Sequence, residues 1–366
     1  MTNKTEYYSD LAIPPGEYLE EVLEDLGMTK EELARRMGRP ASKLSQIFNG
    51  TKAITPETAL QLEKVLGIPS HIWTGLETEY RLTKARNEEA EREEQLKSEA
   101  PLTTKFCYND LEKLGVVKKT RKPLERVKSL TSFFGVTSLK NIMTLQRYKA
   151  AFRCIGGGKR SREALASWLR LGELRAQKFQ CAPFDEKRLR NLLPELRKMT
   201  CQNPEEFEDS LIEKLAECGI ALVMCPHFPK THAHGATFWL RPDKAVVMIT
   251  LRRKWADIFW FSLFHEIGHI LLHGTKAVIV EHDGDDYREK EADEFAANTL
   301  IPEKEYMEFL NRQNFYRDNI INFARRIQIH PGIIAGRLQH DNILKPEWRN
   351  ELRVRYEWKD NHSEVA

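Results

Sequence analysis

The sequence predicts a mainly helical protein with one short β-sheet in its last third. Two observations indicate helices: apolar residues recur at helical spacing through residues 14–76 and again through residues 102–215. A third observation indicates the sheet, because short β-prone runs are grouped between residues 219 and 251. The chain has 366 residues, which is long enough for two or three domains with separate cores.

Five short helices are predicted in residues 14–76. Thr29 stands three residues before Glu32, which is a capping-box start, and Gly38 follows an apolar run and favours a helix end. The predicted helices cover residues 15–26, 29–37, 40–48 and 55–66, and a fifth begins near residue 70. The second and third have the spacing of a helix-turn-helix, although a plain helical bundle would look the same.

The distribution of charge is more informative than the net charge of +3, which excludes a chain that is polybasic throughout. Residues 1–100 contain 13 Lys and Arg against 19 Asp and Glu, whereas residues 30–52 contain six basic and two acidic residues. A basic island on an acidic domain indicates a local anion-binding face. A solvated surface is the alternative.

The region after the predicted fifth helix is less informative. Residues 78–100 are strongly charged and helix-prone, which predicts a solvated helical linker that ends at Pro101. Residues 102–215 predict further helices without a chemical motif, and we identify no internal repeat. Eight basic and three acidic residues between 105 and 128 could extend a nucleic-acid surface, but they fit a solvated face better.

The last part of the chain predicts a small α+β domain. Three short strands are predicted at residues 220–224, 236–240 and 245–251. A helix over about 254–272 follows, and after an acidic loop a second helix over about 287–300 ends before Pro302. We therefore divide the chain into residues 1–77, a linker 78–101, a helical middle region 102–215, the α+β domain 216–340 and a tail 341–366.

The predicted helix over 254–272 contains the motif His265-Glu266-Ile267-Gly268-His269. Residues four apart lie on one face of a helix, so His265 and His269 can direct two imidazoles at one metal ion. Glu266 is offset and can meet a metal-bound water. The apolar flanks predict a buried helix, in which these polar groups need partners. Zinc is the metal that this pattern indicates, and a chance occurrence is the alternative.

A catalytic zinc site usually has a third protein ligand and an open position. In the predicted helix 287–300, Glu289 and Asp293 fall toward the apolar side and share a face. We predict Glu289 as the third ligand and Asp293 as an acceptor that orients a ligand histidine; two solvated surface acids are the alternative. An oxyanion stabiliser stays open, and a structural role fits each candidate as well. The candidates are His232, His234, Tyr287 and His330.

The segments 265–273 (HEIGHILLH), 289–297 (EKEADEFAA) and 300–302 (LIP) together resemble the ImmA/IrrE family of zincin-like metallopeptidases. The resemblance covers about residues 215–340. That family usually has Asn where this chain has Asp293, which is similar to the ExxxD pairing of thermolysin-like enzymes. The resemblance implies Zn²⁺ as cofactor and hydrolysis of a regulatory protein, often a repressor. Glu266 would accept a proton from the zinc-bound water and pass it to the leaving amine.

The third predicted helix is the candidate recognition helix. Its apolar residues are needed inside, which leaves Ser42, Lys43, Ser45, Gln46 and Asn49 outside. Glutamine and asparagine can read adenine edges, and lysine can contact guanine or phosphate. Two further lysines, one before and one after this helix, are candidate phosphate contacts. They are Lys30 and Lys52.

The segments 15–19 (PGEYL), 32–38 (ELARRMG), 45–50 (SQIFNG) and 54–60 (ITPETAL) resemble HigA-type antitoxins. These belong to the lambda-repressor-like (XRE) helix-turn-helix group, and the resemblance covers about residues 13–85. It implies a five-helix fold, binding to double-stranded operator DNA, usually as a homodimer, and sometimes neutralisation of a toxin partner.

The two resemblances lead to one hypothesis: a transcriptional regulator that binds an operator and cleaves a regulatory protein. The alternative is a DNA-binding antitoxin or repressor whose zinc domain binds or senses without turnover. The polar residues 1–10 predict no secretory signal, and the apolar run 258–272 is too short and too polar for a membrane span. With six cysteines and no CxxC pair, we expect a cytoplasmic protein with reduced thiols.

Overall fold

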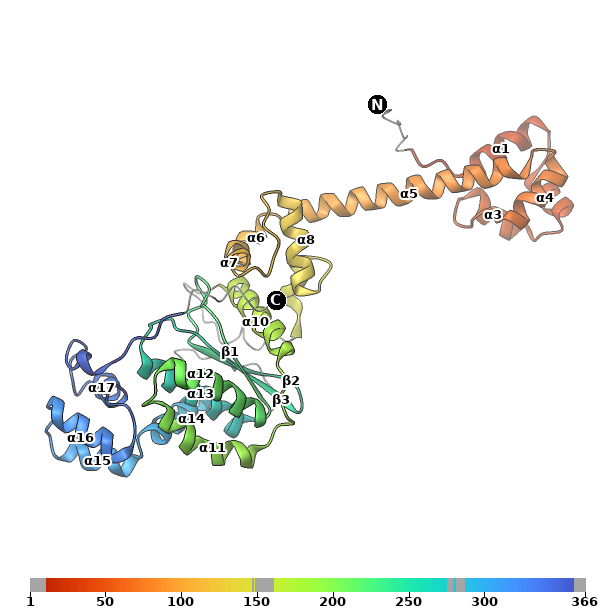
Figure 1. Ribbon diagram of the computed structural model, residues 1–366. Helices are drawn as coiled ribbons and strands as arrows, with labels where there is room; N and C mark the ends of the chain where they lie inside the picture. The colour runs from red at the N-terminus through yellow and green to blue at the C-terminus, as the bar shows by residue number, and fades with distance from the viewer. Residues whose placement is uncertain (1–10, 147, 149–160, 275–278, 281–286, 359–366) are drawn as a thin grey trace. The chain divides into compact units, whose positions relative to one another are not determined.

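A computed structural model describes residues 11–146, 148, 161–274, 279–280 and 287–358 (Figure 1). The chain forms two compact units, Met1–Ser98 and Glu99–Ala366. The predicted fold class is confirmed: the protein is mostly helical, with a helix-turn-helix in the first unit and a small mixed sheet in the second. Among the described helices, none is both long enough and apolar enough to cross a membrane.

The first unit contains the five predicted helices. They are α1 (Pro15–Asp25), α2 (Lys30–Met37), α3 (Ala41–Phe48), α4 (Pro56–Leu66) and α5 (Ser70–Ser98). One half of the predicted capping box is present, because the Thr29 hydroxyl accepts a hydrogen bond from Glu32 N at 3.1 Å, whereas the Glu32 carboxylate pairs with Arg35 and Arg36. Gly38 ends α2 in the left-handed conformation, with φ 64°. Leu19, Leu33 and Trp73 lie fully buried in the common core, so all five helices share one hydrophobic centre.

The helix α5 differs from the predicted organisation, because it continues without a break through residue 77. Its first turns belong to the domain: Trp73 is buried, and the carboxylate of Glu77 accepts from Ile54 N at 3.0 Å and pairs with Arg81 at 2.7 Å. Most residues after Thr83 are exposed. The predicted linker 78–101 is therefore mainly the solvated second half of a domain helix.

The predicted middle region belongs to the second unit. Its helices within the described residues are α6 (Leu102–Lys105), α7 (Tyr108–Lys113), α8 (Pro123–Phe134), η1 (Leu139–Thr144), α10 (Arg162–Lys178), α11 (Glu186–Met199) and α12 (Pro204–Glu217). Helix α10 is tied to the sheet, because Lys244 Nζ donates to the carbonyls of Ala176 and Phe179 at 2.8 and 2.6 Å. These bonds add a donor to carbonyls at the end of α10, where the helix has few donors of its own; the Ala176 carbonyl also accepts from Phe179 N at 3.3 Å.

The sheet has the strand order β1-β3-β2-β4. Its strands are β1 (Ile220–Met224), β2 (Gly235–Arg241), β3 (Lys244–Ile249) and β4 (Ile279–Val280). Strand β3 pairs parallel to β1 and antiparallel to β2, and β2 pairs antiparallel to β4. The sequence predicted three strands, because β4 has only two residues and forms no pattern. Side chains on alternate faces of β2 and β3 meet α10 on one side and α13 on the other.

The remaining helices are α13 (Ala256–His273), α14 (Tyr287–Leu300), α15 (Glu303–Asn311), α16 (Arg317–Ile327), α17 (Pro331–His340) and η2 (Asn350–Leu352). The expectation of a C-terminal tail differs from the structure. Arg353 forms a two-pronged ion pair with the buried Asp257, at 3.0 and 2.8 Å, and Tyr356 is buried and accepts from Trp260 Nε1 at 3.0 Å. Residues 350–358 therefore complete the core around α13.

Two pairs of helices, one in each unit, are joined by similar connections. Residues 33–37 (LARRM) and 323–327 (FARRI) each end a helix before a residue in the left-handed conformation, Gly38 and Gln328. A second helix begins three residues later in both places, at Ala41 and Pro331. Helices α16 and α17 thus repeat the connection between α2 and α3.

Candidate metal centre and nucleic-acid face

Helix α13 carries the predicted HExxH motif inside the second unit. His265, Glu266 and His269 are at most 1% exposed, and the two Nε2 atoms lie 2.9 Å apart. Gly268 allows the neighbouring helix α14 to approach, because a Cβ on this residue would stand only 3.0 Å from Phe295 Cδ1. The close packing of α13 against α14 brings the two helices' polar residues to one point.

Glu289, on α14, reaches the same point as the two histidines. Its carboxylate oxygens lie 3.2 Å from His265 Nε2 and 3.7 Å from His269 Nε2, and the residue is 5% exposed. Burial pushes the pKa of Glu289 upward. Hydrogen bonds with the two imidazoles and their charges outweigh burial and lower this pKa to about 2. The carboxylate is therefore held in the charged form that a metal ligand needs.

The donor set fits a zinc ion. One ligand atom each from His265, His269 and Glu289 lies within 4.8 Å of the others, and all three residues are buried. Two imidazole nitrogens with one carboxylate are a common donor set of catalytic zinc. A cation between them could take a lone pair from each of these three buried groups, which is why the residues fit this group.

The outward-facing nitrogens of the two imidazoles also have partners. His265 Nδ1 lies 2.8 Å from Oδ1 of Asp293, the residue that was predicted to orient a ligand histidine. His269 Nδ1 lies 2.9 Å from His273 Nδ1, and His273 Nε2 lies 3.1 Å from Glu291 Oε2. Neither His273 nor Glu291 was among the predicted site residues. The spacing of His273, four residues after His269, was the signal that could have found it.

Glu266 lies against strand β2. Its Oε2 accepts a hydrogen bond from the Thr237 hydroxyl at 2.5 Å, and that hydroxyl also lies 3.2 Å from the Glu266 carbonyl. Gly235 gives the carboxylate its space, because a Cβ there would stand 2.4 Å from Oε1. Sequence reasoning missed Thr237 and Gly235, since no local pattern links them to a motif about thirty residues away.

Two of the four candidates for an oxyanion stabiliser have side-chain contacts that fit a structural role. His330 caps α17 by accepting from Gly332 N at 3.1 Å, and His232 Nδ1 lies 2.9 Å from Arg252. The carbonyl of His234 accepts from Thr250 N at 2.9 Å, and Tyr287 is 70% exposed. We assign none of them.

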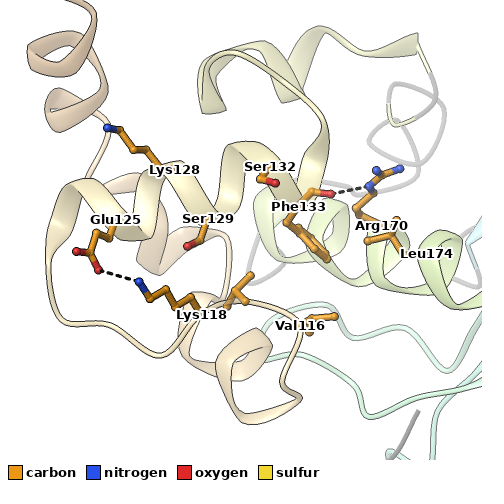
Figure 2. A pocket seen from close by; sticks show the side chains of 10 residues that line it. Val116, Lys118, Glu125, Lys128, Ser129, Ser132, Phe133, Arg170 and Leu174 are labelled. Carbon is orange, nitrogen blue, oxygen red and sulfur yellow. Dashed lines mark hydrogen bonds and ion pairs between the residues drawn. The ribbon is translucent and has the colours of Figure 1, made fainter. Parts of the chain in front are cut away.

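The cavity in Figure 2 lies elsewhere in the second unit. It has a volume of about 530 Å³ and is lined by residues of α8, α10 and the segment 116–118. Its cations have partners within the chain: Lys118 lies 4.0 Å from Glu125, and Arg170 donates to Phe133 O at 2.9 Å and pairs with Glu173 at 2.8 Å. It shares no residue with the metal centre, so donor geometry and not cavity size identifies the site.

The candidate recognition helix α3 has the predicted orientation. Leu44, Ile47 and Phe48 are 1, 2 and 5% exposed. The opposite side offers Ser42, Lys43, Ser45, Gln46 and Asn49 to solvent. Lys30 differs from the two other predicted lysine contacts, because it pairs with Glu20 and lies 4.4 Å above the Phe48 ring. It would have to leave these partners to bind a phosphate.

Comparisons with known proteins address both units. A helix-turn-helix family model matches residues 19–73, and a model described as IrrE N-terminal-like domain, of the M78 peptidase family, matches residues 222–339. The HTH-type transcriptional regulator YddM of Escherichia coli (strain K12) is 34% identical over 71 residues, which are 19% of this chain and 76% of that protein. The chain belongs to the XRE helix-turn-helix family and carries an M78 peptidase-family domain. The resemblances drawn from the sequence are thereby confirmed.

Two further proteins resemble this XRE-family chain. Virulence-associated protein I of Dichelobacter nodosus is 33% identical over 78 residues, which are 21% of this chain and 72% of that protein. The structure of an addiction module antidote protein of a HigA family from Coxiella burnetii is 32% identical, with a TM-score of 0.21, and covers 23% of this chain and 92% of that one. These similarities concern the first unit, and a helix-turn-helix domain of this family implies DNA binding.

Proposed function

We propose that the protein is a cytoplasmic transcriptional regulator whose second unit is a zinc-dependent endopeptidase that hydrolyses a regulatory protein partner. The observation that carries the peptidase proposal is the convergence of His265, His269 and Glu289 beside the buried carboxylate of Glu266. A site that only holds the fold together has no need of this fourth, acidic group.

The geometry supports a role for each of these residues. His265, His269 and Glu289 would hold the zinc, which when bound supplies a Lewis acid that polarises a carbonyl and acidifies a water. Glu266 would take the proton of that water and deliver it to the leaving amine. The Thr237 hydroxyl fixes one oxygen of Glu266, so the other is the one to receive the proton. Asp293 would hold the ring of His265 in one orientation.

The test compares the full chain with its Glu266→Gln variant. We expect both to bind about one zinc per chain, measured by elemental analysis, because Glu266 is not a ligand. Only the unchanged chain should cleave the product of the adjacent gene in its own operon, or itself, on a denaturing gel. Glu294→Gln is the matched control, since this glutamate is exposed on α14, and it should keep both properties.

The rival function is a DNA-binding antitoxin or repressor whose zinc domain binds or senses without turnover. It would be favoured if both proteins bound zinc and neither cleaved either substrate. Protein without zinc after purification in zinc-containing buffer would refute the peptidase and the rival together.

We further propose that the first unit binds double-stranded operator DNA as a homodimer, with α3 in the major groove. The support is a helix whose polar side is exposed while its apolar side is buried. The likeness of this unit to HigA-type antidote proteins also makes a toxin a candidate partner. Gln46 and Asn49 would contact base edges, with Ser42 and Lys43 beside them.

The phosphate contacts can be tested by the salt dependence of operator binding. Lys43→Gln and Lys52→Gln should each reduce the slope of log affinity against log salt by about 0.9 per site contacted. Lys30→Gln should change this slope less, because Lys30 already has Glu20 as its partner. Unchanged slopes in both Lys43→Gln and Lys52→Gln would show that these two lysines do not contact DNA phosphates.

A further inference from the structure

We propose that His273 and Glu291 are positioning residues for the metal centre: they fix the imidazole of His269 in the orientation that a zinc ligand needs. The inference rests on the zinc site of the proposed function, and it does not depend on whether the site hydrolyses a peptide. Neither residue belongs to the predicted ligand set, and both lie on the helices that carry the ligands, α13 and α14.

The positions of the nitrogens assign a donor and an acceptor to each contact. The Nε2 atoms of His265 and His269 face each other and Glu289. A neutral imidazole that offers the Nε2 lone pair to a metal carries its proton on Nδ1. His269 Nδ1–H therefore donates to His273 Nδ1, 2.9 Å away. His273 then carries its own proton on Nε2 and donates it to Glu291 Oε2 at 3.1 Å.

This arrangement gives each ligand histidine its own orienting group. Asp293 holds His265, and the pair His273–Glu291 holds His269. The two acids stand two residues apart on α14. The side chain of Asp293 is 56% exposed, whereas that of His273 is 6% exposed, so the hydrogen bond to His269 is the better shielded from water.

Helix geometry explains why the third histidine can act on the second. His265, His269 and His273 are spaced four apart, so their rings follow one another along one side of α13. The ring centroids of neighbours lie 4.6 and 5.0 Å apart. His273 Nε2 in turn lies 3.1 Å from Glu291 Oε2. The series of hydrogen bonds that begins at His269 therefore ends on a carboxylate oxygen of α14, which, when the acid is ionised, can only accept.

The alternative is that His273 is a buried histidine that only fills space beside α14. The two readings differ in what they predict for metal affinity. A space-filling role predicts unchanged affinity in any variant that folds, whereas a positioning role predicts a loss that a side chain with the same hydrogen bonds can restore.

The experiment measures the Zn²⁺ affinity of the full chain by competition with a chromophoric chelator at fixed pH. We expect His273→Leu to weaken zinc binding roughly 10- to 100-fold, the usual effect of removing a group that orients a ligand. His273→Gln should recover most of the loss, because its amide can accept from His269 and donate to Glu291. The zinc affinity of Glu291→Ala should lie between those of His273→Leu and His273→Gln. Glu294→Gln is the control, and its zinc affinity should equal that of the unchanged protein.

Folding is checked on each variant by circular dichroism. Glu291→Ala changes a partly exposed side chain, so this variant decides the matter even if His273→Leu fails to fold. Equal affinity of unchanged protein, His273→Leu and Glu291→Ala would overturn the proposal and leave the zinc site intact. An unchanged protein that binds no zinc would instead refute the proposed function, and the positioning role with it.

Discussion

The chain builds two helix-turn-helix connections from similar sequences and uses them in opposite ways. Helices α2 and α3 place their second helix at a solvated surface, whereas α16 and α17 place theirs inside the second unit. The two turns are closely alike. Gly38 and Gln328 are left-handed, with φ 64° and 56°, and the next residue's N–H bonds to the carbonyl of Ala34 or Ala324 at 2.9 and 3.1 Å.

The difference lies in the second helix. When Ala34 is aligned with Ala324, the exposed Gln46 of α3 corresponds to Gly336 of α17. A Cβ on Gly336 would stand 2.1 Å from Asp257 Oδ2, the oxygen that accepts from Arg353 at 2.8 Å. Helix α17 is thus pressed against α13, the helix of the metal centre. The two turns share a backbone conformation, and the side chains on the second helix determine whether that helix is exposed or buried.

The largest effect expected from this comparison concerns the aligned positions 46 and 336. Gly336→Ala should destabilise the second unit by about 3 kcal/mol, because its Cβ must displace one partner of a buried ion pair. Gln46→Ala should change stability by less than about 0.5 kcal/mol, since Gln46 is exposed. Hydrogen exchange followed by mass spectrometry on the full chain reports the two units separately. Equally small changes in stability in Gly336→Ala and Gln46→Ala would contradict the close contact between α17 and α13.

The second prediction concerns operator affinity at the aligned positions. Gln46→Ala and Asn49→Ala should each weaken operator binding at fixed salt by about 1–3 kcal/mol, which is roughly 5- to 150-fold. The residue aligned with Asn49 is Gln339, whose Nε2 donates to Trp348 O at 2.7 Å. Gln339→Ala should leave operator affinity unchanged in a fluorescence anisotropy titration. If only Gln339→Ala lost operator affinity, the DNA contact would lie on α16 and α17, and the assignment to α2 and α3 would be wrong.

The third prediction concerns the residues that end the first helices. Gly38→Ala should cost about 1 kcal/mol, because a Cβ is unfavourable in the left-handed region. Gln328→Gly should change the free energy of unfolding by less than about 1 kcal/mol, since relief of that strain opposes the greater freedom of glycine in the unfolded chain. Exchange rates in α2 and α16 measure the two effects. A larger loss at Gln328 than at Gly38 would mean that its side chain makes a contact important for the second unit.

The same comparison shows what sequence patterns could predict. Caps, glycines and apolar spacing are local, and they gave five helices and an orientation of α3 that the structure confirms. The convergence of the candidate ligands could be predicted because His265 and His269 are neighbours on one helix and Glu289 has a definite phase on another. Thr237, Gly235 and Arg353 were missed because they reach α13 only through tertiary packing. The burial of α17 was missed for the same reason, since its turn signal matches that of an exposed helix.

The last prediction uses the caps of the two second helices. The N-terminal cap of α3 is Pro40, which has no titrating side chain, whereas that of α17 is His330, whose Nδ1 accepts from Gly332 N. Burial lowers the pKa of His330, opposed by the charge of Asp257. Folding therefore favours neutral His330, so this stabilisation is present above the ordinary histidine pKa of about 6.5 and declines as pH falls below it.

Amide exchange in α17, corrected for the intrinsic effect of pH, should therefore accelerate between about pH 7 and pH 5, while exchange in α3 should not. His330→Asn keeps a side chain that can cap a helix but cannot titrate, so it should make α17 as insensitive to pH as α3. If the acceleration persisted in His330→Asn, another titrating group would be responsible for it. The His330 cap would then contribute no more to the pH dependence than Pro40 does at the start of α3.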